Sequence, residues 1–106
     1  MKQFNQSNFQ EEVIKSDKPV IVDCYTDSCM PCRMMAPIIS QVEKEHIGKI
    51  VFGRLNIEDN PMLALDYRVL SVPTILFIKD GKVMGKVEEA VTKSVIDSKI
   101  KKYFGD

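Results

Sequence analysis

Two of the three cysteines are separated by only two residues. Cys29 and Cys32 enclose Met30 and Pro31, where a helix is expected to begin. Residues three apart on a helix have Cβ atoms about 5–6 Å apart, which is close to disulfide reach. Unpaired N–H groups at a helix start favour a thiolate, so we expect Cys29 to be the nucleophile. Cys32, one turn further in, suits the resolving thiol that attacks a mixed disulfide.

An aspartate stands close before this pair. Asp23 follows the apolar run Val20-Ile21-Val22, where an ionised carboxylate is costly unless it has a partner. A buried carboxyl beneath the cysteines would accept the Cys32 proton as that sulfur attacks. The alternative is that Asp23 only caps or pairs locally, and the residues alone leave both interpretations open.

The third cysteine has a simpler interpretation. Strand alternation directs Cys24 to the face opposite Asp23, which predicts a buried apolar thiol; the alternative is a redox switch. With His46 the three cysteines would make a Cys₃His set, but the spacing is not that of a common zinc site, so we expect no metal. Near the C-terminus, the lysines are expected to form a solvated helix face: Lys93, Lys99, Lys101 and Lys102.

Length and charge restrict the class of protein. The 106 residues predict one domain over 1–106, and 15 basic against 15 acidic residues give no field for nucleic acid. The longest apolar run, Ile75-Leu76-Phe77-Ile78, is far too short to cross a membrane. The N-terminus has no apolar leader, and the bunched cysteines are unlike a secreted disulfide framework, so we expect a cytoplasmic protein. No nucleotide motif is present, and no cofactor is expected.

Local patterns predict alternating helices and strands. Ser7 and Gln10 match a capping box for a first helix, and Thr92 is expected to cap the last. Strands are expected over 19–25 and 50–56, a helix bent at Pro37 over 31–46, a short helix from Pro61, and a hairpin of 74–79 with 82–87. This order predicts an α/β fold: a parallel core extended by an antiparallel pair, with helices on both faces.

The sequence resembles the thioredoxin family over nearly its whole length. The motifs that carry the resemblance occur in the family's order: Val22-Asp23, Cys29-Met30-Pro31-Cys32-Arg33, Met35-Ala36-Pro37, Arg54-Leu55-Asn56-Ile57-Glu58, Asn60-Pro61, Val72-Pro73-Thr74 and Lys79-Asp80-Gly81. The resemblance implies the thioredoxin fold, a central mixed sheet flanked by helices. It also implies a protein-disulfide reductase that a thioredoxin reductase recharges.

The resemblance assigns roles to single residues. It implies that Cys29 is the nucleophile, Cys32 the resolving cysteine and Asp23 the buried acid. It also implies that Val72-Pro73 is a cis bond opposite the cysteines, where the Val72 backbone would pair with an extended substrate. The expected substrate groove comprises Ser28, Met30, Pro31, Val72 and Pro73.

Several positions depart from the family pattern. Tryptophan is usual in the family at the positions of Tyr25 and Ser28. Glycine is common at the positions of Met30 and Glu88. Arg54 replaces a lysine near the buried acid and would lower its pKa if the two pair.

We therefore expect a monomeric thiol-disulfide oxidoreductase that acts on disulfide-containing client proteins. The alternatives are a disulfide oxidase or isomerase on the same fold, and a thioredoxin-like binding module without turnover.

Overall fold

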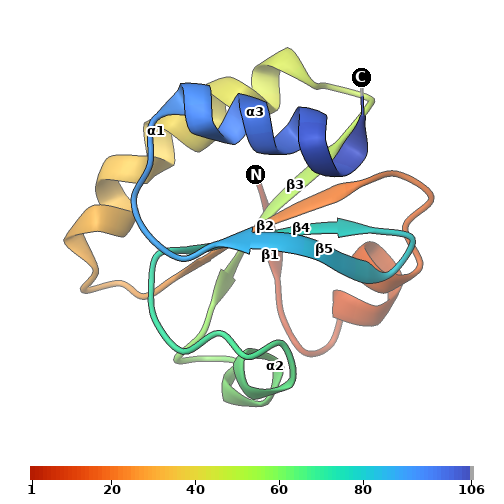
Figure 1. The fold of residues 1–106 in the computed structure, drawn as a ribbon. Coiled ribbons are helices and arrows are strands. Elements are labelled where there is room, and N and C mark those ends of the chain that lie inside the picture. Colours follow the sequence, from red (N-terminus) through yellow and green to blue (C-terminus); the bar gives the residue numbers. More distant parts are fainter. Residues whose placement is uncertain (106) are drawn as a thin grey trace.

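One five-stranded sheet forms the centre of the molecule, with helices on both of its faces (Figure 1). The computed structural model describes residues 1–105. The strands, in the spatial order β1-β3-β2-β4-β5, are β1 (Lys2–Phe4), β3 (Val51–Asn56), β2 (Val20–Tyr25), β4 (Thr74–Lys79) and β5 (Lys82–Val87). The helices are η1 (Gln10–Ile14), α1 (Met30–Glu45), α2 (Pro61–Asp66) and α3 (Lys93–Phe104).

Strand β2 lies in the middle of the sheet. It pairs in parallel with β3 and antiparallel with β4, and Asp23 stands opposite Arg54 on one side and Ile75 on the other. The parallel pairing of β1 with β3 and the β4–β5 hairpin complete the mixed sheet. Residues 20–24 are fully buried, so this strand is covered on both of its faces.

Strand alternation divides the core into two clusters. Ile21 packs with Met35 and Ile39 of α1 on one face of the sheet. Val22 and Cys24 belong to the cluster on the other face. Because successive side chains of a strand point to opposite faces, Asp23 shares the α1 face with Ile21. The sheet therefore separates Asp23 from Cys24.

Two local predictions are confirmed at residue level. The hairpin strands have the predicted bounds, and Asp80 and Gly81 both have positive φ, 52° and 75°. A two-residue hairpin turn of type I′ requires positive φ at both of its central residues. The Thr92 hydroxyl accepts a hydrogen bond from the Val95 amide at the start of α3.

The N-terminal segment differs from its prediction. Strand β1 was not predicted, and the first helical segment, η1, is a short π-helix. The predicted capping box is wrong. The side chain of Asn5, not that of Ser7, accepts hydrogen bonds from free backbone amides, namely those of Ser7 and Asn8. An Asx-type turn thus competes successfully with the Ser7–Gln10 cap.

Helix α1 continues through Pro37 to Glu45. In the described part of the chain, no helix combines the length and the apolar character needed to span a membrane.

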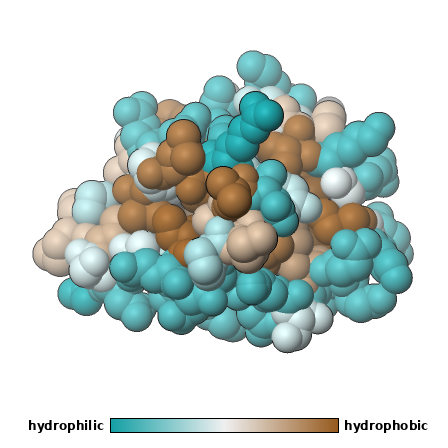
Figure 2. All heavy atoms as spheres, turned by 90° about the horizontal axis from the view of Figure 1, so that it is seen from below, coloured by the Kyte–Doolittle hydropathy of each residue, from teal (hydrophilic) through white to brown (hydrophobic). Residues whose placement is uncertain are grey.

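Figure 2 shows apolar side chains gathered in the middle of the face that lies below in Figure 1, the side of α2. Met62, Leu65 and Leu70, in and just after α2, are among the large apolar side chains that stay exposed.

Candidate redox site

A disulfide joins Cys29 and Cys32 at the start of α1. Cys29 is the N-cap residue, with extended backbone angles of φ −82° and ψ 107°, and Pro31 lies in the first turn. The two Cα atoms are 5.3 Å apart, within the usual range for a disulfide. Proline suits this position because its missing N–H would have no partner in the first turn. The change from extended chain to helix therefore brings the two sulfurs together.

The two cysteines differ in environment. The Sγ atom of Cys29 accepts a hydrogen bond from the Cys32 amide at 3.1 Å, which is one of the N-terminal amides of α1. Cys29 is half-buried, whereas only 1% of Cys32 is exposed. The first sulfur can be approached from outside, and the second is reached through the first.

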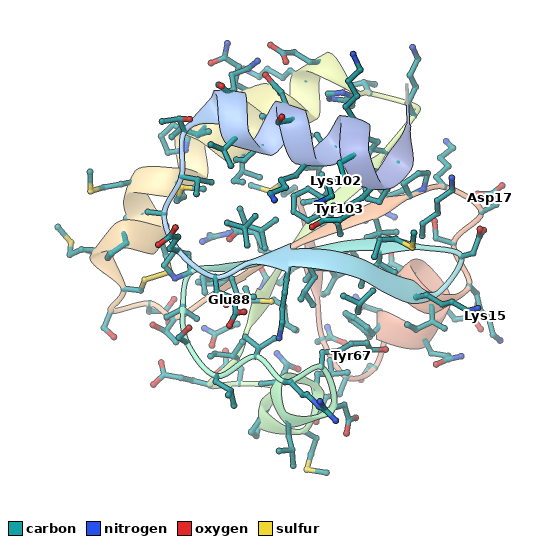
Figure 3. All side chains as sticks on the ribbon, viewed as in Figure 1. Lys15, Asp17, Tyr67, Glu88, Lys102 and Tyr103 are labelled. Carbon is teal, nitrogen blue, oxygen red and sulfur yellow. A yellow bond between two sulfur atoms is a disulfide. The ribbon has the colours of Figure 1, made fainter. Side chains whose placement is uncertain are left out.

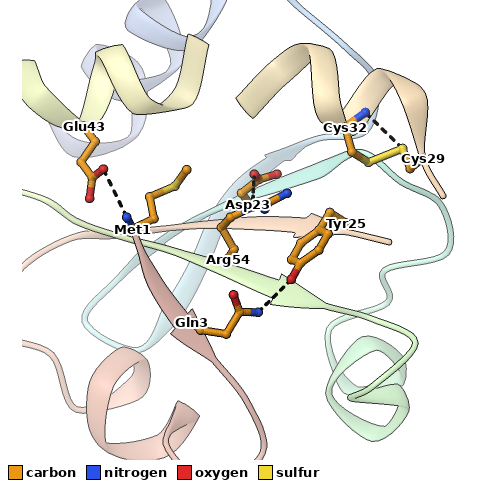
Figure 4. A network of polar contacts seen from close by, with 8 residues as sticks. All are labelled: Met1, Gln3, Asp23, Tyr25, Cys29, Cys32, Glu43 and Arg54. Carbon is orange, nitrogen blue, oxygen red and sulfur yellow. Dashed lines mark hydrogen bonds and ion pairs between the residues drawn. A yellow bond between two sulfur atoms is a disulfide. The ribbon is translucent and has the colours of Figure 1, made fainter. Parts of the chain in front are cut away.

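Asp23 lies beneath α1 and is fully buried (Figure 4). Its Oδ2 atom accepts a hydrogen bond from Arg54 Nε at 3.3 Å. Within residues 1–105, its Oδ1 atom has no hydrogen-bond partner. The carboxyl is therefore only half satisfied, and one oxygen is free to accept a proton.

Burial and Arg54 act on this carboxyl in opposite directions. Burial raises the pKa of Asp23, and the charge and hydrogen bond of Arg54 lower it; burial has the larger effect, so the pKa is raised. The pairing with Arg54 therefore does not reverse the rise in the pKa of Asp23, and the carboxylate can still act as a proton acceptor.

Arg54 is held by an aromatic ring. Its guanidinium carbon lies 3.7 Å from the centre of the Tyr25 ring, and the Tyr25 hydroxyl accepts a hydrogen bond from Gln3 Nε2 at 3.0 Å (Figure 4). These contacts join three strands and were missed in the sequence, because no local spacing connects Gln3, Tyr25 and Arg54.

A surface cavity of about 350 Å³ opens beside the pair. Tyr25, Arg33 and Arg54 line it together with Cys32. Arg33 is anchored by a hydrogen bond from its Nη2 to the backbone oxygen of Asp27 at 2.7 Å. Solvent in the cavity reaches Arg54, whose side chain is 28% exposed, whereas Cys32 is only 1% exposed.

The expected groove residues gather at one end of the sheet. Ser28, Met30 and Pro31 adjoin the cysteines and are exposed, Met30 to 62%. The Val72-Pro73 bond is cis, as the resemblance implied. Pro73 directly precedes Thr74, which pairs with Cys24 near the end of β2 that leads to Cys29. Val72 and Pro73 therefore lie at the sheet end that carries the disulfide.

Cys24 lies outside this site. It is buried on the far face of the sheet, and burial, with a smaller contribution from the charge of Asp23, raises the pKa of its thiol to about 12. Among the residues that the structure describes, no three His, Cys, Asp or Glu side chains are grouped to hold a metal ion.

Fold and site together define a class: small α/β proteins in which a dithiol, at a helix start beside a buried carboxyl, interconverts with a disulfide. The Thioredoxin family model matches residues 1–102. The chain belongs to the thioredoxin family.

Three relatives illustrate the similarity. The thioredoxin of Chlorobaculum thiosulfatiphilum is 41% identical over 98 residues, covering 92% of this chain and 91% of the relative. The chloroplastic M-type thioredoxin of Pisum sativum is 43% identical over 99 residues, which are 93% of this chain but 58% of the relative. The thioredoxin of Porphyra purpurea is 37% identical over 101 residues, covering 95% of this chain and 94% of the relative.

Proposed function

We propose that the protein is a dithiol-disulfide oxidoreductase that reduces disulfides of client proteins. The observation that carries the proposal is the disulfide between Cys29 and Cys32, whose first sulfur is accessible and lies at the start of α1. Membership of the thioredoxin family supports it.

The reaction exchanges one disulfide for another. The Cys29 thiolate attacks a client disulfide; a bond forms between Cys29 and one client sulfur, and the other client sulfur leaves as a thiolate. The Cys32 thiolate then attacks Cys29, forms the Cys29–Cys32 bond and releases the second client thiolate. The client gains two electrons from the protein dithiol, and its two thiolates then take up from solvent as many protons as the Cys29 and Cys32 thiols released.

Asp23 supplies the proton acceptor for the second step. Cys32 is buried, so bulk water cannot easily remove its proton, and Asp23 lies on the face of the sheet that α1 covers. The raised pKa of Asp23 places its titration nearer to that of a thiol. We assign Asp23 as the general base for Cys32.

The groove would position the client. An extended client segment pairs with the Val72 backbone beside Pro73, and its side chains contact Ser28, Met30 and Pro31. The exposure of Met30 supports this role, because a flexible thioether adapts to different client side chains.

The remaining partners follow from the electron balance. A thioredoxin reductase returns the disulfide to the dithiol after each turnover. One chain supplies every residue of the site, which supports a monomer. The bunched cysteines, unlike a secreted disulfide framework, support a reducing compartment such as the cytoplasm.

Reduction of insulin in the presence of dithiothreitol tests the proposal. The wild-type protein should accelerate reduction, Cys29→Ser should abolish the acceleration, and Cys32→Ser should trap insulin in a mixed disulfide. Cys24→Ala is the matched control and should retain activity, because Cys24 lies on the other face of the sheet. An unaccelerated reaction with the wild type would reject the proposal.

Redox equilibration separates a reductase from a disulfide oxidase. In a glutathione series, a reductase keeps the Cys29–Cys32 disulfide until conditions are strongly reducing. Reduction already under mildly reducing conditions would assign the protein to the oxidases instead.

A further inference from the structure

The ion pair between Arg54 and Asp23 is weakly held by its own contacts. One hydrogen bond of 3.3 Å joins the two side chains, and 28% of the Arg54 side chain is exposed to solvent. A long side chain that is partly in water has many other rotamers available. A further contact is therefore needed to keep the guanidinium next to the carboxylate.

Tyr25 provides this contact from the neighbouring strand. Residues 23 and 25 of β2 point to the same face, so the ring lies beside Asp23, and the guanidinium carbon of Arg54 lies 3.7 Å from its centre. This is the geometry of a cation–π contact, which is strongest where water is partly excluded. Gln3 of β1 fixes the ring through its bond to the Tyr25 hydroxyl.

The other elements around Asp23 bring few charges. Strand β4 places Ile75 beside it, and α1 covers the face with Cys32 and Met35. The Met1 ammonium and the Glu43 carboxylate are drawn in the same view and pair with each other at 3.7 Å (Figure 4).

Cys24 lies on the other face of the sheet. Burial and the charge of Asp23 raise the pKa of its thiol, and the charge of Lys86 lowers it. The ion pair recorded for Asp23 within residues 1–105 is that with Arg54.

We infer that Tyr25 is a positioning residue for disulfide exchange: its ring, fixed by Gln3, holds the Arg54 guanidinium against the Asp23 carboxylate. The inference rests on the proposed function. In the step concerned, Cys32 passes its proton to Asp23 and bonds to Cys29, while the bond from Cys29 to the client sulfur breaks. When Arg54 is held in place, Asp23 stays ionised down to a lower pH than it would without this contact. It can therefore still accept the Cys32 proton at that lower pH.

Substitution of the ring tests this role. In Tyr25→Leu, Arg54 loses its contact, so the titration of Asp23, followed by ¹³C NMR of its carboxyl carbon, should move to higher pH. The acid limb of the pH profile for insulin reduction should move in the same direction. A shift of one unit lowers the ionised fraction about tenfold at pH values well below the pKa. Tyr25→Trp, which keeps an aromatic face, should restore both curves.

Three further variants complete the experiment. Arg54→Met sets the largest shift that loss of the cation can cause. Gln3→Ala, at an exposed position, keeps the ring but releases it, and should move the Asp23 titration in the same direction by less. Tyr67→Leu removes a tyrosine that lies outside the site. This variant is the control and should leave the Asp23 titration unchanged.

The outcomes separate this inference from the function itself. If Tyr25→Leu folds and its Asp23 titrates as in the wild type, Tyr25 has no positioning role, even though the wild-type protein reduces insulin. If Tyr25→Leu does not fold, an unchanged titration in Gln3→Ala overturns the inference. If the wild type fails to reduce insulin, the proposed function falls, and the NMR titration still reports whether Tyr25 acts through Arg54.

Discussion

The amide nitrogen of Cys32 lies 3.1 Å from the sulfur of Cys29, so the second cysteine donates a hydrogen bond to the first. This contact and the difference in exposure predict an order of reaction. In the reduced protein, iodoacetamide should modify Cys29 first and leave Cys32 largely unmodified, because only 1% of Cys32 is exposed. Peptide mass spectrometry after brief exposure measures this, and equal modification of the two cysteines would contradict the assignment of Cys29 as nucleophile.

Cys24 should be inert in the folded protein. Its thiol is buried and its pKa is raised to about 12, so almost no thiolate forms at neutral pH. In the oxidised protein, Ellman's reagent should detect no thiol until denaturant is added, and then one per chain. A reaction before unfolding would favour the redox-switch interpretation.

Asp23→Asn should stabilise the protein at neutral pH. Because burial raises the pKa of Asp23, the folded protein binds this proton more tightly than the unfolded chain does. The wild type therefore loses stability as pH rises from the usual aspartate pKa of 3.8 through the raised value. The variant should therefore gain stability above that range, by about 1.4 kcal/mol for each unit by which the pKa of Asp23 is raised.

Urea unfolding at a series of pH values measures this effect. The gain should disappear as the pH falls towards 3.8, where the carboxyl is protonated in both states. Asp17→Asn is the matched control, since Asp17 is exposed at the surface (Figure 3), and should change the free energy of unfolding by less than about 0.5 kcal/mol. A gain that does not depend on pH would contradict the explanation.

Two glycines should differ in their tolerance of alanine. A Cβ at Gly53 would overlap the ring of Phe4, which is fully buried, so Gly53→Ala should lower the free energy of unfolding by about 1–3 kcal/mol. A Cβ at Gly85 would meet Tyr103, which points from α3 towards β5 (Figure 3). The Tyr103 ring is only half-buried and can move aside, so Gly85→Ala should cost less. Thermal unfolding of both variants measures the difference.

Features that depend on neighbouring residues could be predicted from the sequence. The turn at Asp80 and Gly81, the Thr92 cap and the cysteine pair each arise from residues within a few positions of one another. Strand alternation also placed Cys24 on the face away from Asp23.

Features that depend on distant residues could not be predicted. Strand β1 has three residues and no apolar pattern, and its pairing with β3 decides its structure. Competition from Asn5 overrode the Ser7 cap. The contact between Tyr25 and Arg54 requires the register of β2 on β3, and whether burial or Arg54 dominates at Asp23 depends on packing that no spacing reveals.

The position of Cys24 has a consequence for the products of exchange. A third sulfur within reach of the pair could form three different bridges, and only the one between Cys29 and Cys32 is the disulfide that exchange with a client leaves. Because a whole layer of main chain stands between Cys24 and the other two, each round of exchange ends in a single product.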